Sequence, residues 1–500
     1  MKEKLAAFKA EMGEIWDLYM ASSLLGWDQQ TYMPPNGAVE RSEQLATLSK
    51  LAHIKSTTPE VGEALEELKK YAETLDPDSN DARFIRRAKI EYDKATRVPA
   101  EKVAEYARVT ALAQEKWVQA RAKSDFSIFR PHLERIVELR REYADYFKPY
   151  DHVYDPLLDD FEPGLKTAEV KGIFARLRPQ QVELVKEIAS RPQVEDDFLH
   201  LKYEDQKQWD FGVDVITRFG YNWEGGRQDR SAHPFTTSFG IGDVRITTRV
   251  IENMVTSALF STMHEGGHAM YQQGLDTSLS RTILANGASM AIHESQSRMW
   301  ENLVGRSRAF WKFFYAKLQS TFPTQLGNVP MEKFYKAVNK VEPSFIRVEA
   351  DEATYNLHVM LRLELEIELM EGTLKVADLP EAWNNRMREY LGVTPQKDSE
   401  GVLQDVHWSG GMIGYFPTYA LGNLVSVQLW EKINQEIPDL DSQIEQGQFS
   451  ALLDWLRENV HRHGSKFDPQ ELVQRITGSK IDPQPYVGYL RKKYSDIYGL

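Results

Sequence analysis

The pentapeptide His264-Glu265-Gly266-Gly267-His268 constrains this chain more than any other segment. In an α-helix, residues four apart lie on one face, so both imidazoles can reach the same metal ion. Glu265 lies one residue round from His264, where its carboxylate can contact a water on the ion without ligating the ion itself. A zinc ion held in this way lowers the pKa of its water to about 7, and the carboxylate can take the proton as the water attacks a carbonyl. The pattern therefore predicts a metal-dependent peptidase, with an accidental match on a surface helix as the alternative.

The composition is that of an ordinary globular protein, and it limits the partners. Of the 500 residues, 42% are hydrophobic and 27% are charged. The net charge of −13 argues against nucleic acid, because phosphate contacts require clustered Lys and Arg in excess. Since the chain has no cysteine, any metal must be held by His, Asp or Glu, and a reducing compartment fits best. The first residues lack the continuous apolar stretch of a signal peptide, so we expect a cytoplasmic protein.

One run without any charged residue, from Trp408 to Trp430, is long enough to be considered as a membrane span. Its glycines, its proline and its asparagine make it a poor candidate for a lone spanning helix. We interpret the run as a buried wall or as the lining of a cleft, and we expect no membrane partner.

Most of the sequence has the spacing of amphipathic helices. Hydrophobic residues recur three and four positions apart through residues 129–147, with Arg and Glu between them. The chain is therefore expected to be mainly α. Similar stripes occupy residues 4–24, 60–75, 164–190, 308–320 and 353–371, and proline-containing breaks fall at 33–37, 76–78, 98–99 and 148–149. The length of the chain would permit about two to four domains, but none of the breaks resembles a long flexible linker, and we expect one domain over residues 1–500.

The clearest β signal lies in residues 233–250, just before the metal motif. Two β-branched and aromatic runs flank the glycine-rich turn of residues 240–243, which predicts a hairpin. An extended peptide could add to such a sheet edge beside the metal. The following helix is expected to start near Asn253 and to end at Gly274. Each glycine of the motif costs a helix about 1 kcal/mol relative to Ala, so another helix or the substrate backbone must approach closely there.

A catalytic zinc site takes three protein ligands and an open position. One large peptidase class has a third His six residues after the second motif His, and Gly274 at that position excludes this class. The other arrangement takes a carboxylate from a following helix, which we expect over residues 288–304. Glu294 is our choice of ligand within it, and Glu301 is the alternative. A surface ion pair between Glu294 and Arg298 is the structural alternative for the same residues.

Six short motifs in a fixed order resemble the signature set of the carboxypeptidase Taq family of metallocarboxypeptidases. The segment from Gly26 to Pro34 also looks like that family, so the resemblance spans most of the chain. The motifs are His233-Pro-Phe, Asp243-x-Arg245-x-Thr247, His264-Glu-x-x-His268, His293-Glu294-Ser-Gln296, Ile346-Arg347-x-x-Ala350-Asp351 and Gly401-x-x-Gln404-Asp405-x-His407-Trp408.

The resemblance implies a two-lobed helical fold with a deep active-site cleft and one small β-sheet, similar to angiotensin-converting enzyme and neurolysin. We expect the helices of residues 1–80 to cover that cleft, and the family implies a homodimer. The implied activity is the release of single residues from peptides with a free C-terminus. His264, His268 and Glu294 would bind one divalent metal ion per chain, and Glu265 would act as general base and later as acid. Zn²⁺ is the first choice, with Co²⁺ or Mn²⁺ possible at a His-His-Glu site.

The substrate's terminal carboxylate calls for arginine, whose planar fork binds a carboxylate through two hydrogen bonds. Arg245 on the hairpin and Arg347 are the candidates. Their structural alternatives are ion pairs, of Arg245 with Asp243 and of Arg347 with Asp351 or Glu349.

The tetrahedral oxyanion needs a hydrogen-bond donor besides the metal. His407 can supply a ring N–H, and Tyr415 or Tyr419 can supply a hydroxyl, with ordinary core packing as the alternative for all three. His233 is the last substrate-binding candidate, and we interpret it as a group of the cleft wall, as we do Gln404 and Asp405.

Two other functions remain open for this sequence. A metallo-oligopeptidase or dipeptidyl carboxypeptidase would use the same metal site with a longer cleft. An inactive peptide-binding scaffold is the alternative outside enzymes, although such a protein has no chemical reason to keep His264, Glu265 and His268 together.

Overall fold

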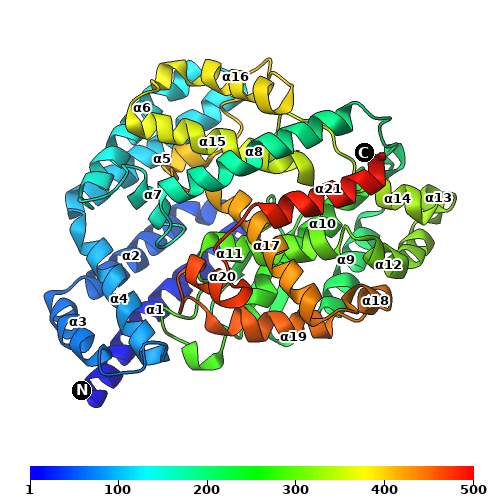
Figure 1. The fold of residues 1–500 in the computed structure, drawn as a ribbon. Helices are drawn as coiled ribbons and strands as arrows, with labels where there is room; N and C mark the ends of the chain where they lie inside the picture. The colour runs from blue at the N-terminus through cyan, green and yellow to red at the C-terminus, as the bar shows by residue number, and fades with distance from the viewer.

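The computed structural model describes all 500 residues, and the chain is mainly helical with one small sheet (Figure 1). The α-helices are α1 (Lys2–Thr31), α2 (Ala38–Ser56), α3 (Pro59–Ala72), α4 (Asn80–Arg97), α5 (Ala100–Lys123), α6 (Phe126–Asp145), α7 (Asp155–Asp159), α8 (Thr167–Ala189), α9 (Asp205–Phe219), α10 (Val255–Gln273), α11 (Met290–Arg298), α12 (Arg308–Thr321), α13 (Pro323–Leu326), α14 (Met331–Ala337), α15 (Glu352–Glu371), α16 (Leu379–Leu391), α17 (Pro417–Glu436), α18 (Leu440–Glu445), α19 (Ser450–Asn459), α20 (Pro469–Thr477) and α21 (Gln484–Tyr498).

The predicted helical stripes and their breaks agree with the structure. The five stripes fall within or overlap α1, α3, α8, α12 and α15, and the prolines after residue 32 separate α1 from α2. Side-chain caps set several helix starts: Ser79 accepts a hydrogen bond from the Ala82 N–H, and Asp351 accepts from the N–H groups of Ala353 and Thr354. The mainly helical prediction is confirmed.

The three-stranded sheet has the order β1-β3-β2, with β1 (Gly226–Arg230), β2 (Thr236–Ser238) and β3 (Val244–Thr248). The antiparallel pair of β2 and β3 is the predicted hairpin, with Thr236 opposite Ile246. The parallel strand β1 is an addition that the sequence did not indicate, because its residues, Gly-Arg-Gln-Asp-Arg, have no apolar alternation. Val244 and Ile246 are fully buried in the main core beside α10.

The hydrophobic residues form one large core and one small one. The small core joins α1, α3 and α4 to the segment after α10, through Leu279, Leu284 and Ala285. These N-terminal helices lie together at the lower left of Figure 1, in blue. They are therefore fastened to the loop that leads from the metal-motif helix into α11.

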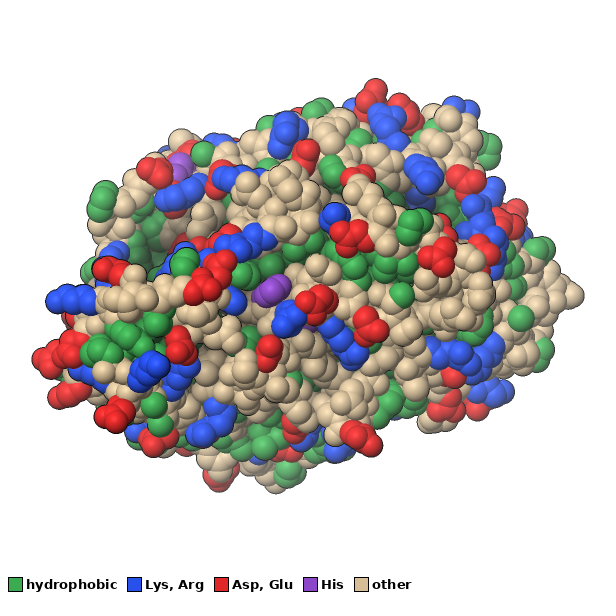
Figure 2. All heavy atoms as spheres, turned by 60° about the horizontal axis from the view of Figure 1, so that its bottom comes forward, with side chains coloured by type: hydrophobic (Ala, Val, Ile, Leu, Met, Phe, Trp, Pro, Cys, Tyr) green, Lys and Arg blue, Asp and Glu red, His purple; other side chains and the backbone are tan.

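The charge-free run is buried, as interpreted from the sequence. Most of it is α17, whose residues from Pro417 to Leu429 are almost all inaccessible to solvent, and α17 packs closely along α11. None of the helices combines the length and the apolar character that crossing a bilayer requires. On the face drawn in Figure 2, acidic and basic side chains are interspersed, and hydrophobic side chains gather in the hollow across its middle.

Candidate metal centre and active site

Helix α10 carries the metal motif and places its two histidines on one face. The helix begins at Val255, two residues after the predicted start, and ends at Gly274 as predicted. A Cβ added at Gly267 would lie 2.7 Å from the Cα of Ser297 and 2.8 Å from the carbonyl oxygen of Gln296. The expected close approach at Gly267 is therefore made by another helix, α11, and not by the backbone of a substrate.

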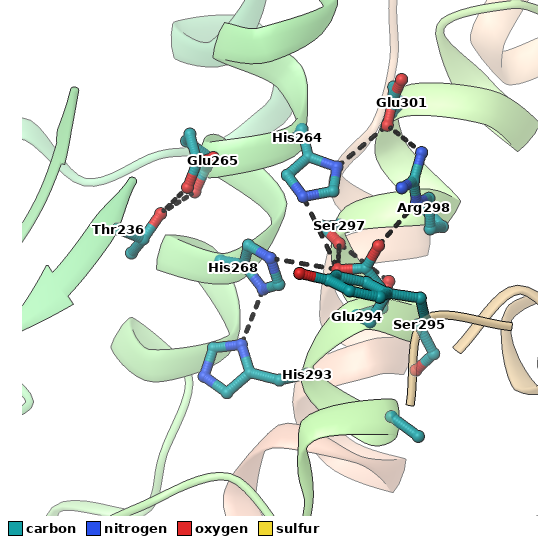
Figure 3. A network of polar contacts seen from close by, with 12 residues as sticks. Thr236, His264, Glu265, His268, His293, Glu294, Ser295, Ser297, Arg298 and Glu301 are labelled. Carbon is teal, nitrogen blue, oxygen red and sulfur yellow. Dashed lines mark hydrogen bonds and ion pairs between the residues drawn. The ribbon is translucent and has the colours of Figure 1, made fainter. Parts of the chain in front are cut away.

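Helix α11 brings a carboxylate to the two histidines (Figure 3). Ser289 caps this helix by accepting a hydrogen bond from the Ile292 N–H. The Oε2 of Glu294 lies 3.6 Å from the Nε2 of His264 and 3.5 Å from the Nε2 of His268. The candidate ligand atoms of these three residues all lie within 4.8 Å of one another, so they fit around one ion. Two imidazoles and a carboxylate are a donor set for Zn²⁺ and similar divalent ions.

Glu301 lies on the other side of the His264 ring. A six-residue π-helical turn, Met299–Val304, continues α11, and Glu301 lies within it. Its Oε2 is 2.9 Å from the Nδ1 of His264. A carboxylate at Nδ1 favours the tautomer that leaves Nε2 free as a ligand, which is the usual arrangement behind a metal-binding histidine.

Arg298 makes the ion pair with Glu294 that was the structural alternative, and this pair leaves the ligand position open. Its Nε donates to Oε1 of Glu294 at 2.7 Å, while Oε2 faces the histidines. Its Nη1 also donates to Glu301 at 3.1 Å. Burial alone would raise the pKa of Glu294, but Arg298 and His264 beside it hold that pKa well below its usual value. Glu294 is therefore ionised, as a ligand must be.

His293 supports the second motif histidine. Its Nδ1 lies 2.7 Å from the Nδ1 of His268, and its Nε2 lies 2.8 Å from the side-chain nitrogen of Gln272. Burial and the neighbouring His268 lower the pKa of His293 well below its usual value. When the Nδ1–H of His268 donates to Nδ1 of His293, the Nε2 of His268 is free to ligate. The Nε2–H of His293 then requires the oxygen of the Gln272 amide, and not its nitrogen, as its acceptor.

Glu265 is held by the hairpin on the opposite side of α10 from His293 (Figure 3). The hydroxyl of Thr236 on β2 donates to Oε2 of Glu265 at 2.6 Å, and the same hydroxyl lies 3.0 Å from the Glu265 carbonyl oxygen. Sequence reasoning missed Thr236, although its position in the strand next to the motif was a usable signal. Strand β2 thus orients the proposed base.

Arg347 is held by Asp405, which corrects the expected pairing with Asp351 or Glu349. Its Nε and Nη2 donate to Oδ1 of Asp405 at 3.0 and 2.8 Å, and its Nη1 donates to the hydroxyl of Tyr355 at 2.9 Å. Asp351 instead caps α15, so its carboxylate is already occupied by backbone N–H groups. The oxygens of a capping residue are used by the first N–H groups of its helix, and the ion pair of Arg347 is made with Asp405 instead.

Asp405 also binds a second buried arginine, Arg362 on α15. The Nε of Arg362 donates to Oδ2 of Asp405 at 2.7 Å, and its Nη2 donates to Gln404 at 2.8 Å. Gln404 in turn accepts from the backbone N–H of Arg347 at 2.8 Å. Burial would raise the pKa of Asp405, but the two guanidinium groups hold it well below its usual value. Two arginines therefore share one carboxylate.

Arg245 has the ion pair that was its structural alternative. Its Nε and Nη2 each donate to Asp243, both at 2.8 Å. Its guanidinium also lies between the rings of Trp27 on α1 and Phe239, 4.5 and 4.8 Å from their centroids. The structure thus places Arg245 at the contact of the hairpin with the N-terminal helix.

His407, Tyr415 and Tyr419 cluster beside Arg347. The Nε2 of His407 lies 3.2 Å from the Tyr419 hydroxyl, and the rings of His407 and Tyr415 are 5.4 Å apart. Burial lowers the pKa of His407 to about 4, so its ring is neutral at pH 7. His233, by contrast, is exposed before β2, and its one hydrogen bond is made by its carbonyl oxygen, from Ser231.

Two histidines one turn apart on a helix and a carboxylate on the next helix form the donor set of a metallopeptidase, and Glu265 lies between the histidines in the sequence. The helical fold and this set define the class of the protein. A family model described as carboxypeptidase Taq (M32) metallopeptidase matches residues 7–494, and the chain belongs to this family of metallocarboxypeptidases.

Named relatives agree with this assignment over nearly the whole chain. Thermostable carboxypeptidase 1 of Thermus thermophilus is 42% identical over 96% of both chains. Carboxypeptidase 1 of Bacillus subtilis is 40% identical over 96% of this chain and 95% of its own. Among solved structures, the M32 carboxypeptidase of Deinococcus radiodurans has a TM-score of 0.97 at 40% identity, covering 100% of each chain. A Pyrococcus furiosus carboxypeptidase structure has a TM-score of 0.95 at 38% identity, covering 99% of each.

Proposed function

We propose that this metallocarboxypeptidase releases single residues from the free C-terminus of peptides, at a divalent metal held by His264, His268 and Glu294. The observation that carries the proposal is the convergence of two histidine Nε2 atoms and one Glu294 oxygen. Each ligand has a partner on its far side: Glu301 for His264, His293 for His268 and Arg298 for Glu294. Such partners fix the ligands before the ion binds.

The metal is proposed to be Zn²⁺, with Co²⁺ or Mn²⁺ as alternatives for the same donors. A bound divalent ion would lower the pKa of a water molecule and polarise the scissile carbonyl. Glu265, oriented by the Thr236 hydroxyl, takes the proton of the attacking water and delivers it to the leaving amine.

The free carboxylate of the substrate is proposed to bind Arg347. A guanidinium has five N–H donors, and three of them are used by Asp405 and Tyr355, which leaves two for the substrate. Arg347 and Arg362 share the one carboxylate of Asp405, and the neighbouring His407 is neutral. A substrate carboxylate can balance the second buried cation, which gives the site its preference for a chain end.

Arg245 is proposed as the second contact of the substrate, and His407 with Tyr415 as hydrogen-bond donors to the developing oxyanion. Tyr415 lies close enough to Glu294 for that charge to raise its pKa, after burial itself, to about 12, so its hydroxyl keeps its proton. His233 is proposed only as part of the wall of the cleft.

Further features of the family are proposed for this chain as well. These are one catalytic domain over residues 1–500, two lobes around a deep cleft as in angiotensin-converting enzyme and neurolysin, and a homodimer in the cytoplasm. The helices of residues 1–80 are proposed to cover the cleft. The packing of Trp27 at the end of α1 against Arg245 and Phe239 supports this position of the N-terminal helices.

Mass analysis of peptide products tests the proposal. A peptide with a free C-terminus should lose single residues in succession, chelator should abolish the reaction, and added Zn²⁺ or Co²⁺ should restore it. The same peptide with an amidated C-terminus should be a poor substrate. Internal cleavage, release of dipeptides, or equal cleavage of the amidated peptide would instead assign the chain to the oligopeptidase or dipeptidyl carboxypeptidase alternative.

A further inference from the structure

Helix α15 has a row of buried polar side chains along one face. Tyr355, His358, Arg362 and Glu366 follow one another at spacings of three, four and four residues, which is one face of an α-helix. His358, Arg362 and Glu366 are fully inaccessible to solvent. Tyr355 contacts Arg347, and Arg362 contacts Asp405. Two members of the row therefore belong to the cluster that is proposed to bind the substrate's terminal carboxylate. Glu366, the last of the row, has no part in that site.

Glu366 binds both ends of one turn of the chain. The indole N–H of Trp408 donates to its Oε1 at 2.7 Å, and the backbone N–H of Gly414 donates to its Oε2 at 3.0 Å. The hydroxyl of Tyr154 donates to the same Oε2 at 2.6 Å. Trp408 directly follows His407, and Gly414 directly precedes Tyr415. His407 and Tyr415, the two proposed donors to the oxyanion, are therefore next in sequence to the two residues that donate hydrogen bonds to Glu366 at the ends of the turn.

The turn is rich in glycine, and the hydroxyl of Tyr106 also donates to the carbonyl oxygen of Gly411 at 2.8 Å. Gly411 and Gly414 have φ angles of +71° and +105°, a region that favours glycine. A Cβ at Gly414 would lie 2.3 Å from the carbonyl oxygen of Leu157, so the turn passes directly against α7. Tyr106 contacts the middle of the turn, and Glu366 is the side chain that accepts hydrogen bonds at both of its ends.

The position of Glu366 requires an acceptor on each of its two oxygens, which neither an amide nor an apolar side chain supplies. Glu366 has no ion pair with a basic side chain, and its three hydrogen-bond donors are a phenol, an indole and a backbone amide. Burying a carboxyl group in this way costs stability. A carboxylate can, however, accept from both ends of the turn at once, since each of its oxygens accepts hydrogen bonds.

We propose that Glu366 is a positioning residue that holds the Trp408–Gly414 turn so that His407 and Tyr415 meet the oxyanion of the transition state. This inference rests on the proposed function, because it assumes that His407 and Tyr415 act on the substrate. Glu366 itself touches neither substrate nor metal. Its effect should appear in the chemical step and not in the binding of the substrate or of the metal.

The test is Glu366→Gln in the full-length metal-loaded protein. The amide keeps the volume but places an NH₂ group against one of the donors, so one end of the turn is released. The turnover number kcat should fall about 10- to 100-fold, the size expected when reacting groups are misplaced by a fraction of an ångström to an ångström. KM and the metal content per chain should stay near those of the unmodified protein. Affinity for a phosphonate peptide that mimics the tetrahedral state should fall in parallel with kcat, while affinity for the peptide product should not.

Glu352→Gln is the matched control on the same helix. The Glu352 side chain is 4% exposed and binds Lys493 of α21, far along α15 from the turn. The Glu352→Gln substitution should lower the thermal stability and leave kcat unchanged. Trp408→Phe removes the indole N–H and replaces the indole with a smaller aromatic ring. It should lower kcat, and its effect should be non-additive with that of Glu366→Gln.

Each outcome decides between the possibilities. Unchanged kcat in Glu366→Gln, a loss carried by KM, or a loss of metal would overturn the positioning role, and so would a Glu352→Gln variant that loses kcat equally. If Glu366→Gln does not fold, an unchanged kcat in Trp408→Phe overturns the inference. Failure of the unmodified protein to release single C-terminal residues would instead overturn the proposed function.

Discussion

Gly422 of α17 lies against the proposed metal ligand Glu294, so its substitution by alanine tests the metal centre without touching a ligand. A Cβ at Gly422 would lie 2.6 Å from both the Cβ and the Cγ of Glu294, and 3.2 Å from the carbonyl oxygen of Ala291. The contacts are with the base of the Glu294 side chain, which cannot swing away as a flexible tip could. The ligand or the helix that carries it must move.

The stability and the metal affinity should respond differently. Inserting a methyl group into a packed core costs about 1–3 kcal/mol. Replacing a glycine by alanine inside a helix regains about 1 kcal/mol, which leaves a net loss of about 0–2 kcal/mol. Disturbing the support of a metal ligand, by comparison, weakens metal binding about 10- to 100-fold. The Gly422→Ala protein should therefore still fold, but its affinity for the metal should be low.

Competition with a chromophoric chelator measures the Zn²⁺ affinity, and thermal denaturation of the metal-free protein measures the stability. Gly172→Ala is the control, because Gly172 lies within α8 with no atom near its Cβ position. It should raise stability by about 1 kcal/mol with no change in metal affinity. Unchanged Zn²⁺ affinity in a folded Gly422→Ala protein would refute the reasoning that Glu294 ligates from the α11–α17 contact.

Three further outcomes are expected. Glu265→Gln should keep its metal and fold but lose about 10²–10⁴-fold in turnover, measured by steady-state kinetics; near-normal turnover would show that another group is the base. Arg347→Ala should lose roughly 30- to several-thousand-fold in kcat/KM on free-carboxylate peptides, corresponding to about 2–5 kcal/mol, and an equal loss on amidated peptides would speak against carboxylate recognition. Glu162, whose Oε1 accepts from the Ala291 N–H while Oε2 has no partner, has a pKa that burial raises from 4.5 to about 8. Glu162 therefore ionises at a lower pH in the unfolded chain than in the folded protein, and the free energy of unfolding falls as the pH rises from 4.5 to about 8. Over this pH range, the Tm of Glu162→Gln should rise relative to that of the unmodified protein. A Tm difference that does not vary with pH would contradict this assignment.

Short-range features of this protein were readable from its sequence. The four-residue spacing of His264 and His268, the hairpin around residues 240–243 and the end of α10 at Gly274 depend on residues within a few positions of each other. Local backbone geometry decides such features, so a pattern of residue types is enough to predict them. The need for a close neighbour at the motif glycines was also predictable, but whether that neighbour was a helix or the substrate was not.

Long-range partners were decided only by the tertiary structure. Arg347 pairs with Asp405, 58 positions away, although Asp351 and Glu349 were nearer in sequence. Strand β1, whose polar residues lack any alternation, exists because β3 offers it a hydrogen-bonding edge.

The two acids after the motif illustrate the same division. Glu294 and Glu301 were both candidates for the third ligand, because spacing alone places both of them on one face of the following helix. They differ in which nitrogen of His264 each one faces, Nε2 for Glu294 and Nδ1 for Glu301. The sequence by itself determined the histidine pair and the carboxylate-bearing helix after it. The packing of α11 on α10 at Gly267, together with the π-helical turn that follows, decided which carboxylate meets both histidines, because only the relative position of two helices sets distances between their side chains.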